Sequence, residues 1–151
     1  MARSLHQWMA RALDRVLRRA AATLTARQAV GARGERVAAL YLGRQGYTIL
    51  ERNFTTTLGE IDLIAFRDGV IAFVEVRSLT APGMLDPLET VTRRKQQRVI
   101  RAAQQYASLH ALAEENVELR FDVVSVVFEK GKRGSDVRHV EGAFGESARL
   151  F

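Results

Sequence analysis

The sequence predicts an α/β fold in which a mixed β-sheet of about five strands is flanked by helices. Apolar residues recur at helical spacing over residues 26–45 and 88–109, whereas short apolar stretches rich in β-branched and aromatic residues lie between and after them. After an N-terminal helix, the expected order is one helix, three strands, one helix and two strands, which suits a mixed sheet with helices packed on it. The chain has 151 residues, of which 47% are apolar, enough for one domain with a core.

Residues 1–25 are predicted to form an amphipathic basic helix appended to a domain that spans residues 26–151. Apolar residues such as Leu5, Trp8 and Leu13 recur every three or four positions, with arginines between them. Residues 1–27 hold six arginines and one aspartate, while the rest of the chain holds seventeen basic and sixteen acidic residues. Such a helix suits a targeting peptide, a membrane-surface anchor, a phosphate-binding arm, or a helix packed on the domain or on a partner chain.

The composition excludes several classes of function. The chain has no cysteine, which excludes disulfides, thiolate zinc sites and a cysteine nucleophile. Charged residues interrupt every apolar stretch before it reaches the roughly 18 residues of a membrane span. We therefore expect a soluble protein with no membrane span. The lack of cysteine is compatible with the reducing cytoplasm, which is the location we expect, but leaves the redox compartment open.

Turn residues divide the apolar stretches into elements. Gly46 is well placed to end the first helix of the domain, and Asp68-Gly69 between two apolar runs is a strong hairpin signal. Pro82-Gly83 and Pro87 indicate a loop before the helix at 88–109. The predicted strands cover residues 47–54, 61–67, 70–78, 119–128 and 137–140.

The hairpin register predicts two facing carboxylates. If Asp68 and Gly69 form a two-residue loop, Asp62 lies opposite Glu75, and Glu60 lies opposite Arg77 on the same face. Like charges in such a pair are about 5 Å apart and destabilise the sheet. A hard divalent cation, Mg²⁺ or Mn²⁺, would compensate them, because carboxylates, water and phosphate oxygens are its usual ligands.

The surroundings of these charges are apolar on both faces of the hairpin. The face of Asp62 and Glu75 continues into apolar residues, and the other face is apolar throughout, with Ile61, Leu63, Val74 and Val76. A strand pair of this kind is expected to be buried. The alternative interpretation is an ion-pair ladder at the wet end of a sheet, and a β-bulge would shift the register.

Several segments resemble a known family. Asp62 followed after a hairpin by Glu75-Val76-Arg77 resembles the PD-(D/E)xK restriction-endonuclease-like nucleases. More narrowly, the chain resembles the YraN family of uncharacterised bacterial proteins, which is related to Holliday-junction-resolvase-type nucleases. The resemblance covers residues 29–128 and rests on these segments: Gly34-Glu35, Arg52-Asn53, the stretch from Gly59 to Ile64, the stretch from Phe73 to Arg77, Lys95, and the stretch from Arg120 to Val124.

The resemblance implies a restriction-endonuclease-like fold and roles for particular residues. Asp62 and Glu75 would be metal ligands, the Val76 carbonyl is a candidate for a third, and Glu35 would be an additional acid from the helix. The lysine of the superfamily motif is replaced here by Arg77, which stays protonated and does not readily accept a proton. Lys95 would then supply a migrated lysine.

The helix predicted at 88–109 carries a basic surface. Arg94, Arg98 and Arg101 follow spacings of four and three, so they lie on one face with Arg93 beside them. Such a stripe suits backbone phosphates and carries no base readout. The alternative is an ordinary solvated helix surface.

Other polar residues are interpreted as structural. Asp122 is expected to hydrogen-bond within the sheet, and His6, His110 and His139 lack metal-ligand spacing and are expected to be surface or incidental residues.

Three functions follow from these patterns. The leading hypothesis is a Mg²⁺- or Mn²⁺-dependent endonuclease acting on DNA rather than RNA, with branched, repair or recombination intermediates implied by the resemblance, and with a homodimer as one expected assembly. The second is a non-catalytic nucleic-acid-binding protein with a degenerate nuclease site. The third is an interaction protein whose N-terminal helix docks on a partner or a membrane, with the acid cluster purely structural.

Overall fold

A computed structural model of the chain describes residues 26–80, 91–131 and 133–145. Two α-helices, one short 3₁₀ helix and five strands fall within these ranges. In chain order they are α2 (Ala26–Arg44), β1 (Thr48–Thr55), β2 (Glu60–Arg67), β3 (Val70–Leu79), α3 (Arg93–Leu109), η1 (Leu112–Glu114), β4 (Glu118–Val127) and β5 (Asp136–Val140).

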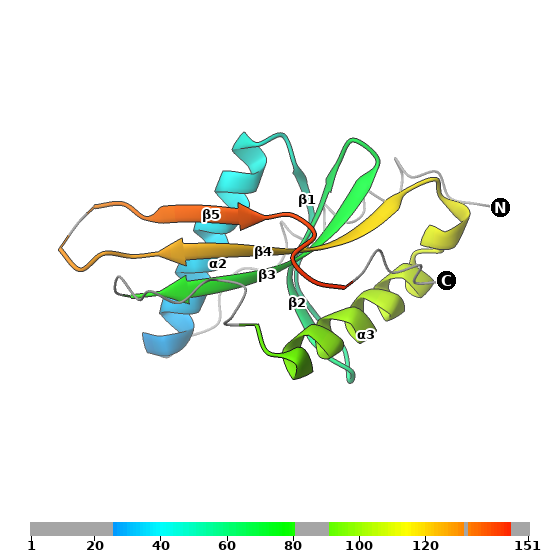
Figure 1. Cartoon of the computed structure of the whole chain (residues 1–151), viewed down its shortest axis with the longest axis horizontal. Helices are drawn as coiled ribbons and strands as arrows, with labels where there is room; N and C mark the ends of the chain where they lie inside the picture. The colour runs from blue at the N-terminus through cyan, green and yellow to red at the C-terminus, as the bar shows by residue number, and fades with distance from the viewer. Residues whose placement is uncertain (1–25, 81–90, 132, 146–151) are drawn as a thin grey trace.

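The strands form one mixed sheet in the order β1-β2-β3-β4-β5. Neighbouring strands are antiparallel except β3 and β4, which are parallel and are connected through α3. The sheet twists strongly, so that β1 and β2 run across the direction of β4 and β5 (Figure 1). The expected α/β class and the five-stranded mixed sheet flanked by helices are therefore confirmed.

Within the described ranges, each face of the sheet packs against one helix. On one face Val99, Ala103 and Tyr106 of α3 pack on a core that includes Ile64 and Phe73. On the other face Ala38 and Leu42 of α2 pack on a core that includes Leu63, Val74 and Val124. Figure 1 shows α2 passing behind the strands while α3 lies in front of them. This burial explains why β2 and β3 read as nearly continuous apolar runs.

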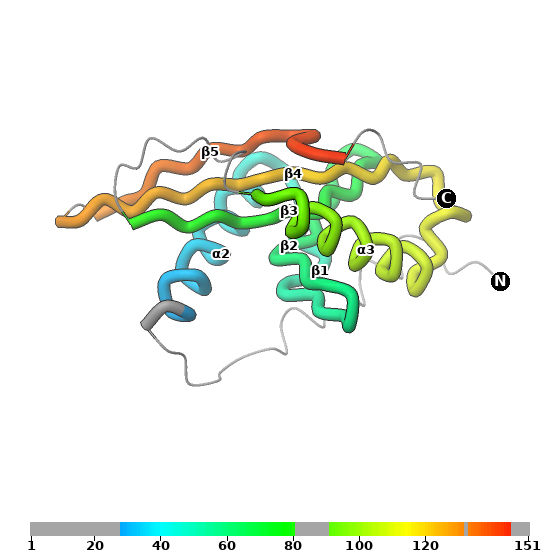
Figure 2. Tube along the Cα trace, turned by 60° about the horizontal axis from the view of Figure 1, so that its bottom comes forward, coloured from blue at the N-terminus to red at the C-terminus, as the bar shows by residue number. Residues whose placement is uncertain are grey.

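The turn that joins β2 to β3 is the predicted two-residue loop. Asp68 and Gly69 both have positive φ, 50° and 80°, as the favoured hairpin turn requires. The predicted register holds from Arg67 opposite Val70 as far as Leu63 opposite Val74. Beyond that point β2 and β3 diverge, while β3 stays paired with β4 along its whole length. Among the described strands, none therefore pairs with this edge of the second half of β3, and Figure 2 shows the same divergence from another side.

This divergence corrects two details of the predicted register. Asp62 and Glu75 lie just beyond the last paired residues rather than within the ladder, and Glu60 does not lie opposite Arg77. Ile61 was also expected beside Leu63 and Val74, but it packs in the α3-side core. The physical reason is a break in the alternation of side chains where β2 leaves β3.

The predicted boundaries need one further correction. The helix expected at 88–109 begins at Arg93, because Thr92 caps it by accepting a hydrogen bond from Lys95 N at 3.2 Å. Val91, which was expected within the helix, is buried just before it. The expected N-terminal helix, the loop at 82–87, Leu88 and His6 lie outside the described residues.

No helix within the described ranges is long and apolar enough to cross a membrane.

Candidate active site at the free edge of β3

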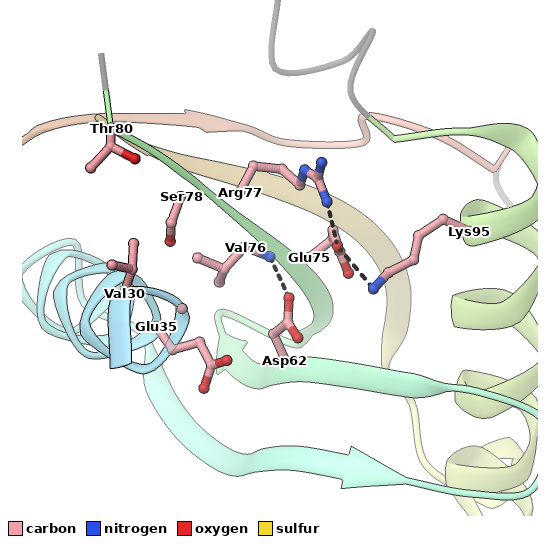
Figure 3. Close-up of a pocket in the computed structure, with 10 residues that line it drawn as sticks. Val30, Glu35, Asp62, Glu75, Val76, Arg77, Ser78, Thr80 and Lys95 are labelled. Atoms are coloured by element: carbon pink, nitrogen blue, oxygen red, sulfur yellow. Dashed lines mark hydrogen bonds and ion pairs between the residues drawn. The ribbon is translucent and has the colours of Figure 1, made fainter. Parts of the chain in front are cut away.

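A cavity of about 540 Å³ opens where β2 diverges from β3, between α2 and the first turn of α3. Its wall includes three acids from three different elements, Glu35 of α2, Asp62 of β2 and Glu75 of β3, together with Arg77 and Lys95 (Figure 3). The fold thus gathers five of the residues predicted from the sequence in one place.

The carboxylate of Asp62 lies where the backbone pairing between β2 and β3 has ended. Its Oδ2 accepts a hydrogen bond from the backbone N–H of Val76 at 2.7 Å. A continued ladder would have paired Val76 with Ile61, so the carboxylate replaces a backbone acceptor. Burial raises the pKa of Asp62, although this hydrogen bond and the charge of Lys95 oppose the rise.

Glu75 is the most deeply buried acid of the cavity, with only 1% of its surface exposed. Its Oε1 lies 3.3 Å from Lys95 Nζ and 3.8 Å from the Arg77 guanidinium. Its Oε2 is buried and has no hydrogen-bond partner in the part of the chain that the structure describes. Burial and the negative charge of Asp62 raise the pKa of Glu75 to about 7. One oxygen of Glu75 is therefore available as a ligand atom.

Lys95 connects α3 to the two strands. Its ammonium lies between Glu75 and Glu60, whose Oε1 is 3.5 Å away. Burial lowers the pKa of Lys95, but the charges of Glu75 and Asp62 outweigh burial and raise it overall. The helix cap at Thr92 fixes the first turn of α3 and so directs Lys95 into the cavity.

Glu35 reaches the cavity because α2 approaches β3 closely. A β-carbon at Gly34 would overlap the hydroxyl oxygen of Ser78, so only glycine permits this approach. Glu35 hydrogen-bonds to Asn53. Burial raises the pKa of Glu35, the Asn53 hydrogen bond lowers it, and the charge of Asp62 raises it again.

The cavity is not a complete cage for a metal ion. Among the described residues, no three carboxylate, histidine or cysteine side chains come together as a metal-binding group. Asp62 and Glu75 lie close together in the cavity. The role of Glu35 as a further ligand stays a prediction.

The basic stripe lies on the exposed side of α3. The helix buries Val99, Ala102, Ala103, Tyr106 and Ala107. Arg93, Arg94, Arg98 and Arg101 are exposed on its other side, and none of them forms an ion pair with a described residue. The stripe begins beside Lys95 and so leads away from the cavity.

Asp122 has structural contacts, as predicted. It is fully buried, and its carboxylate accepts hydrogen bonds from Arg120 at 2.8 and 2.9 Å and from Gly142 N at 3.0 Å. Burial raises the pKa of Asp122, but the hydrogen bonds of His139, Arg120 and Gly142 outweigh it and hold the pKa below its usual value.

The interpretation of His139 as an incidental residue is wrong. Its Nε2 lies 2.8 Å from Asp122 Oδ2, and its ring packs edge-on against Tyr41 and Tyr47. Tyr47 also donates to Glu141 at 2.7 Å and accepts from Arg120. This network joins α2 and the residue that precedes β1 to β4 and β5, away from the cavity. Sequence spacing could not reveal it, because its members come together only when β5 pairs with β4.

Asn53 does not line the cavity but hydrogen-bonds to Glu35, which does, and the sequence reasoning assigned it no role. It has a positive φ of 51° inside a strand, and its partner in a regular β1–β2 register would be Asp62. Asparagine adopts this conformation more readily than most residues, so an asparagine in a strand-like stretch was the available signal. Its conformation places the side chain against Glu35.

The comparisons with known proteins identify the family. The model of the uncharacterised protein family UPF0102 matches residues 34–126. The chain belongs to UPF0102. A UPF0102 protein of Chlorobaculum parvum is 44% identical over 121 residues, which cover 78% of this chain and 92% of that protein. UPF0102 proteins of Clostridium perfringens (39% identical) and of an Anaeromyxobacter species (44% identical) each cover 78% of this chain, and 94% and 86% of their own lengths.

Membership of UPF0102 confirms the family resemblance noted from the sequence, since UPF0102 is the family of YraN-like proteins. The matched region contains every acid and both cations of the cavity, as well as α3. The names of these UPF0102 relatives state no activity.

Proposed function

We propose that the protein is a metal-dependent endonuclease that hydrolyses phosphodiester bonds in DNA. The observation that carries this proposal is the pair formed by half-buried Asp62 and buried Glu75, held beside Lys95 at the edge of β3. Burial raises the pKa of both acids, and the charge of Asp62 raises the pKa of Glu75 further, so both are costly to keep charged, and an ion between them would remove that cost.

The residues present fit a hard divalent cation. The donor atoms are carboxylate oxygens, one of which is buried without a hydrogen-bond partner among the described residues, and none of the described lining residues brings sulfur or imidazole. Such a donor set suits Mg²⁺ or Mn²⁺. Asp62 and Glu75 would hold the ion, which when bound supplies Lewis-acid chemistry for attack of water on a phosphate.

The cationic residues have distinct roles in this proposal. Lys95 and Arg77 place two positive charges within 4 Å of Glu75, where they stabilise negative charge that develops on the phosphate. Arg77 stays protonated, so it orients water or phosphate oxygens and does not act as a base. The exposed arginines of α3 would hold the DNA backbone, as helical stripes of arginine commonly do.

DNA cleavage with Mg²⁺ or Mn²⁺ tests the proposal. Linear, flapped and branched DNA are each incubated with the full chain and with the Asp62→Asn and Glu75→Gln variants. We expect cleavage by the native chain and a loss of about a hundredfold or more in each variant, because each removes a ligand.

Asp68→Asn is the matched control, since Asp68 lies exposed in the turn at the other end of the same hairpin. Cleavage by this variant should equal that of the native chain. Equal activity of the native chain and Asp62→Asn would contradict the proposal, because the cleavage would then come from elsewhere.

A second candidate function is DNA binding without catalysis. It is favoured by Arg77 at the position where related nucleases carry lysine, and by the lack of a third converging ligand among the described residues. Binding to DNA with no cleavage under either metal ion would support this candidate.

A further inference from the structure

The turn between β1 and β2 presents one large apolar side chain to solvent. Leu58 is 48% exposed and follows three threonines, Thr55 to Thr57. A single exposed leucine is ordinary on a protein surface. Whether it has a function therefore depends on how rigidly its turn is held and on which residues surround it.

The turn that carries Leu58 is closed by hydrogen bonds. Thr56 Oγ1 accepts from Leu58 N at 3.0 Å and from Gly59 N at 3.2 Å, and Thr56 N donates to Gly59 O at 2.8 Å. Side chains of Ser and Thr hold turns in this way. Leu58 is thus presented by an ordered turn rather than by a loose loop.

The same turn is fixed against α3. A β-carbon at Gly59 would overlap the backbone carbonyl oxygen of Arg98, so the turn touches the helix at a member of the basic stripe. Arg98 lies three residues, about one helical turn, beyond Lys95. Leu58 also precedes Asp62 by four residues, a reach of at most about 14 Å along an extended chain.

We propose that Leu58 is an apolar wedge that inserts between neighbouring bases of DNA whose phosphates lie on α3, and that it selects DNA with interrupted stacking near the scissile phosphate. Flaps, nicks and branches are the substrates of this class. The proposal rests on the proposed function, because it needs DNA bound along α3.

The physical basis is the cost of unstacking. Apolar side chains that enter a base step separate the two bases, and this costs least where stacking is already interrupted. The arginines of α3 contact phosphates and do not distinguish an intact duplex from a branched one. Leu58 lets the protein distinguish branched DNA from an intact duplex, and it does so within a few nucleotides of Asp62.

Fluorescence of 2-aminopurine at a flap junction tests the wedge directly. The full chain is titrated in EDTA, which prevents cleavage, with flapped DNA and with continuous duplex of the same sequence. The native chain should raise the fluorescence of the flapped DNA, as unstacking does, and should bind it about tenfold more tightly than the duplex.

Leu58→Ala should abolish both the fluorescence rise and the preference for the flap, and Leu58→Phe should retain them. Leu109→Ala is the matched control, because Leu109 is 66% exposed at the far end of α3, and it should behave as the native chain does. A circular-dichroism melt checks that each variant is folded.

The outcomes separate this proposal from the proposed function. If the native chain binds and cleaves DNA but Leu58→Ala keeps the fluorescence rise and the preference for flapped DNA, the wedge proposal is overturned and the proposed function stands. A native chain that neither binds nor cleaves DNA overturns the proposed function and the wedge with it.

Discussion

At the scale of single residues, the carboxyl group of Glu75 combines deep burial with two cationic neighbours and one oxygen that has no hydrogen-bond partner. A purely structural ion pair would normally satisfy both oxygens, since an unsatisfied buried acceptor destabilises the fold. The arrangement therefore supports the proposed role of Glu75 as a metal ligand.

The raised pKa of Glu75 predicts how stability depends on pH when no metal is bound. The folded protein keeps a proton on Glu75 up to about pH 7, whereas the unfolded chain loses it near the ordinary value of 4.5. The contribution of Glu75 is therefore complete below pH 4.5 and is lost as pH rises through 7. We expect the free energy of unfolding to fall between pH 5 and pH 8 by an amount on the order of 2 kcal/mol.

Urea unfolding in EDTA at several pH values measures this dependence. Glu75→Gln should remove most of it, while Glu118→Gln, a change at an exposed position at the start of β4, should leave it unchanged. Equal pH dependence in the native chain and Glu75→Gln would show that the titrating group is elsewhere.

At the scale of elements, the close approach of α2 to β3 at Gly34 and Ser78 decides whether Glu35 reaches the cavity. The extent of α2 and the strands was predictable, because periodicity, Gly46 and the Asp68-Gly69 turn are local signals. The start of α3 was not predictable, because apolar Val91 continues the helical spacing although it lies before the cap at Thr92.

Gly34→Ala tests the contact between α2 and β3. The added methyl group would overlap Ser78, so we expect a loss of about 1–3 kcal/mol in the free energy of unfolding. Gly31→Ala is the matched control, because a β-carbon there meets nothing within 4 Å, and it should be neutral or slightly stabilising.

Ser78→Gly in the Gly34→Ala background should recover part of the loss, since it removes both side-chain atoms that the new methyl group would meet most closely. Urea unfolding of the two single variants and the double variant gives the coupling energy. Additive effects of the two substitutions would rule out the contact as the cause.

At the scale of the whole molecule, the candidate site depends on the divergence of β2 from β3. The sequence was enough to predict that Asp62 and Glu75 come together, because the hairpin turn sets the register from one end. It was not enough to predict where the ladder ends, which is set by the sheet twist and by Asp62 taking the N–H of Val76. The contact of His139 with Asp122 was missed for a similar reason, since it forms only through long-range strand pairing.

Calorimetric titration with Mn²⁺ tests most directly whether Asp62 and Glu75 form a metal site. The native chain and Asp68→Asn should bind Mn²⁺ with the same affinity, whereas Asp62→Asn should bind at least about tenfold more weakly, because it removes one of the two carboxylate ligands. Binding of Mn²⁺ with native affinity by Asp62→Asn, or no binding by the native chain either alone or with DNA, would contradict the account.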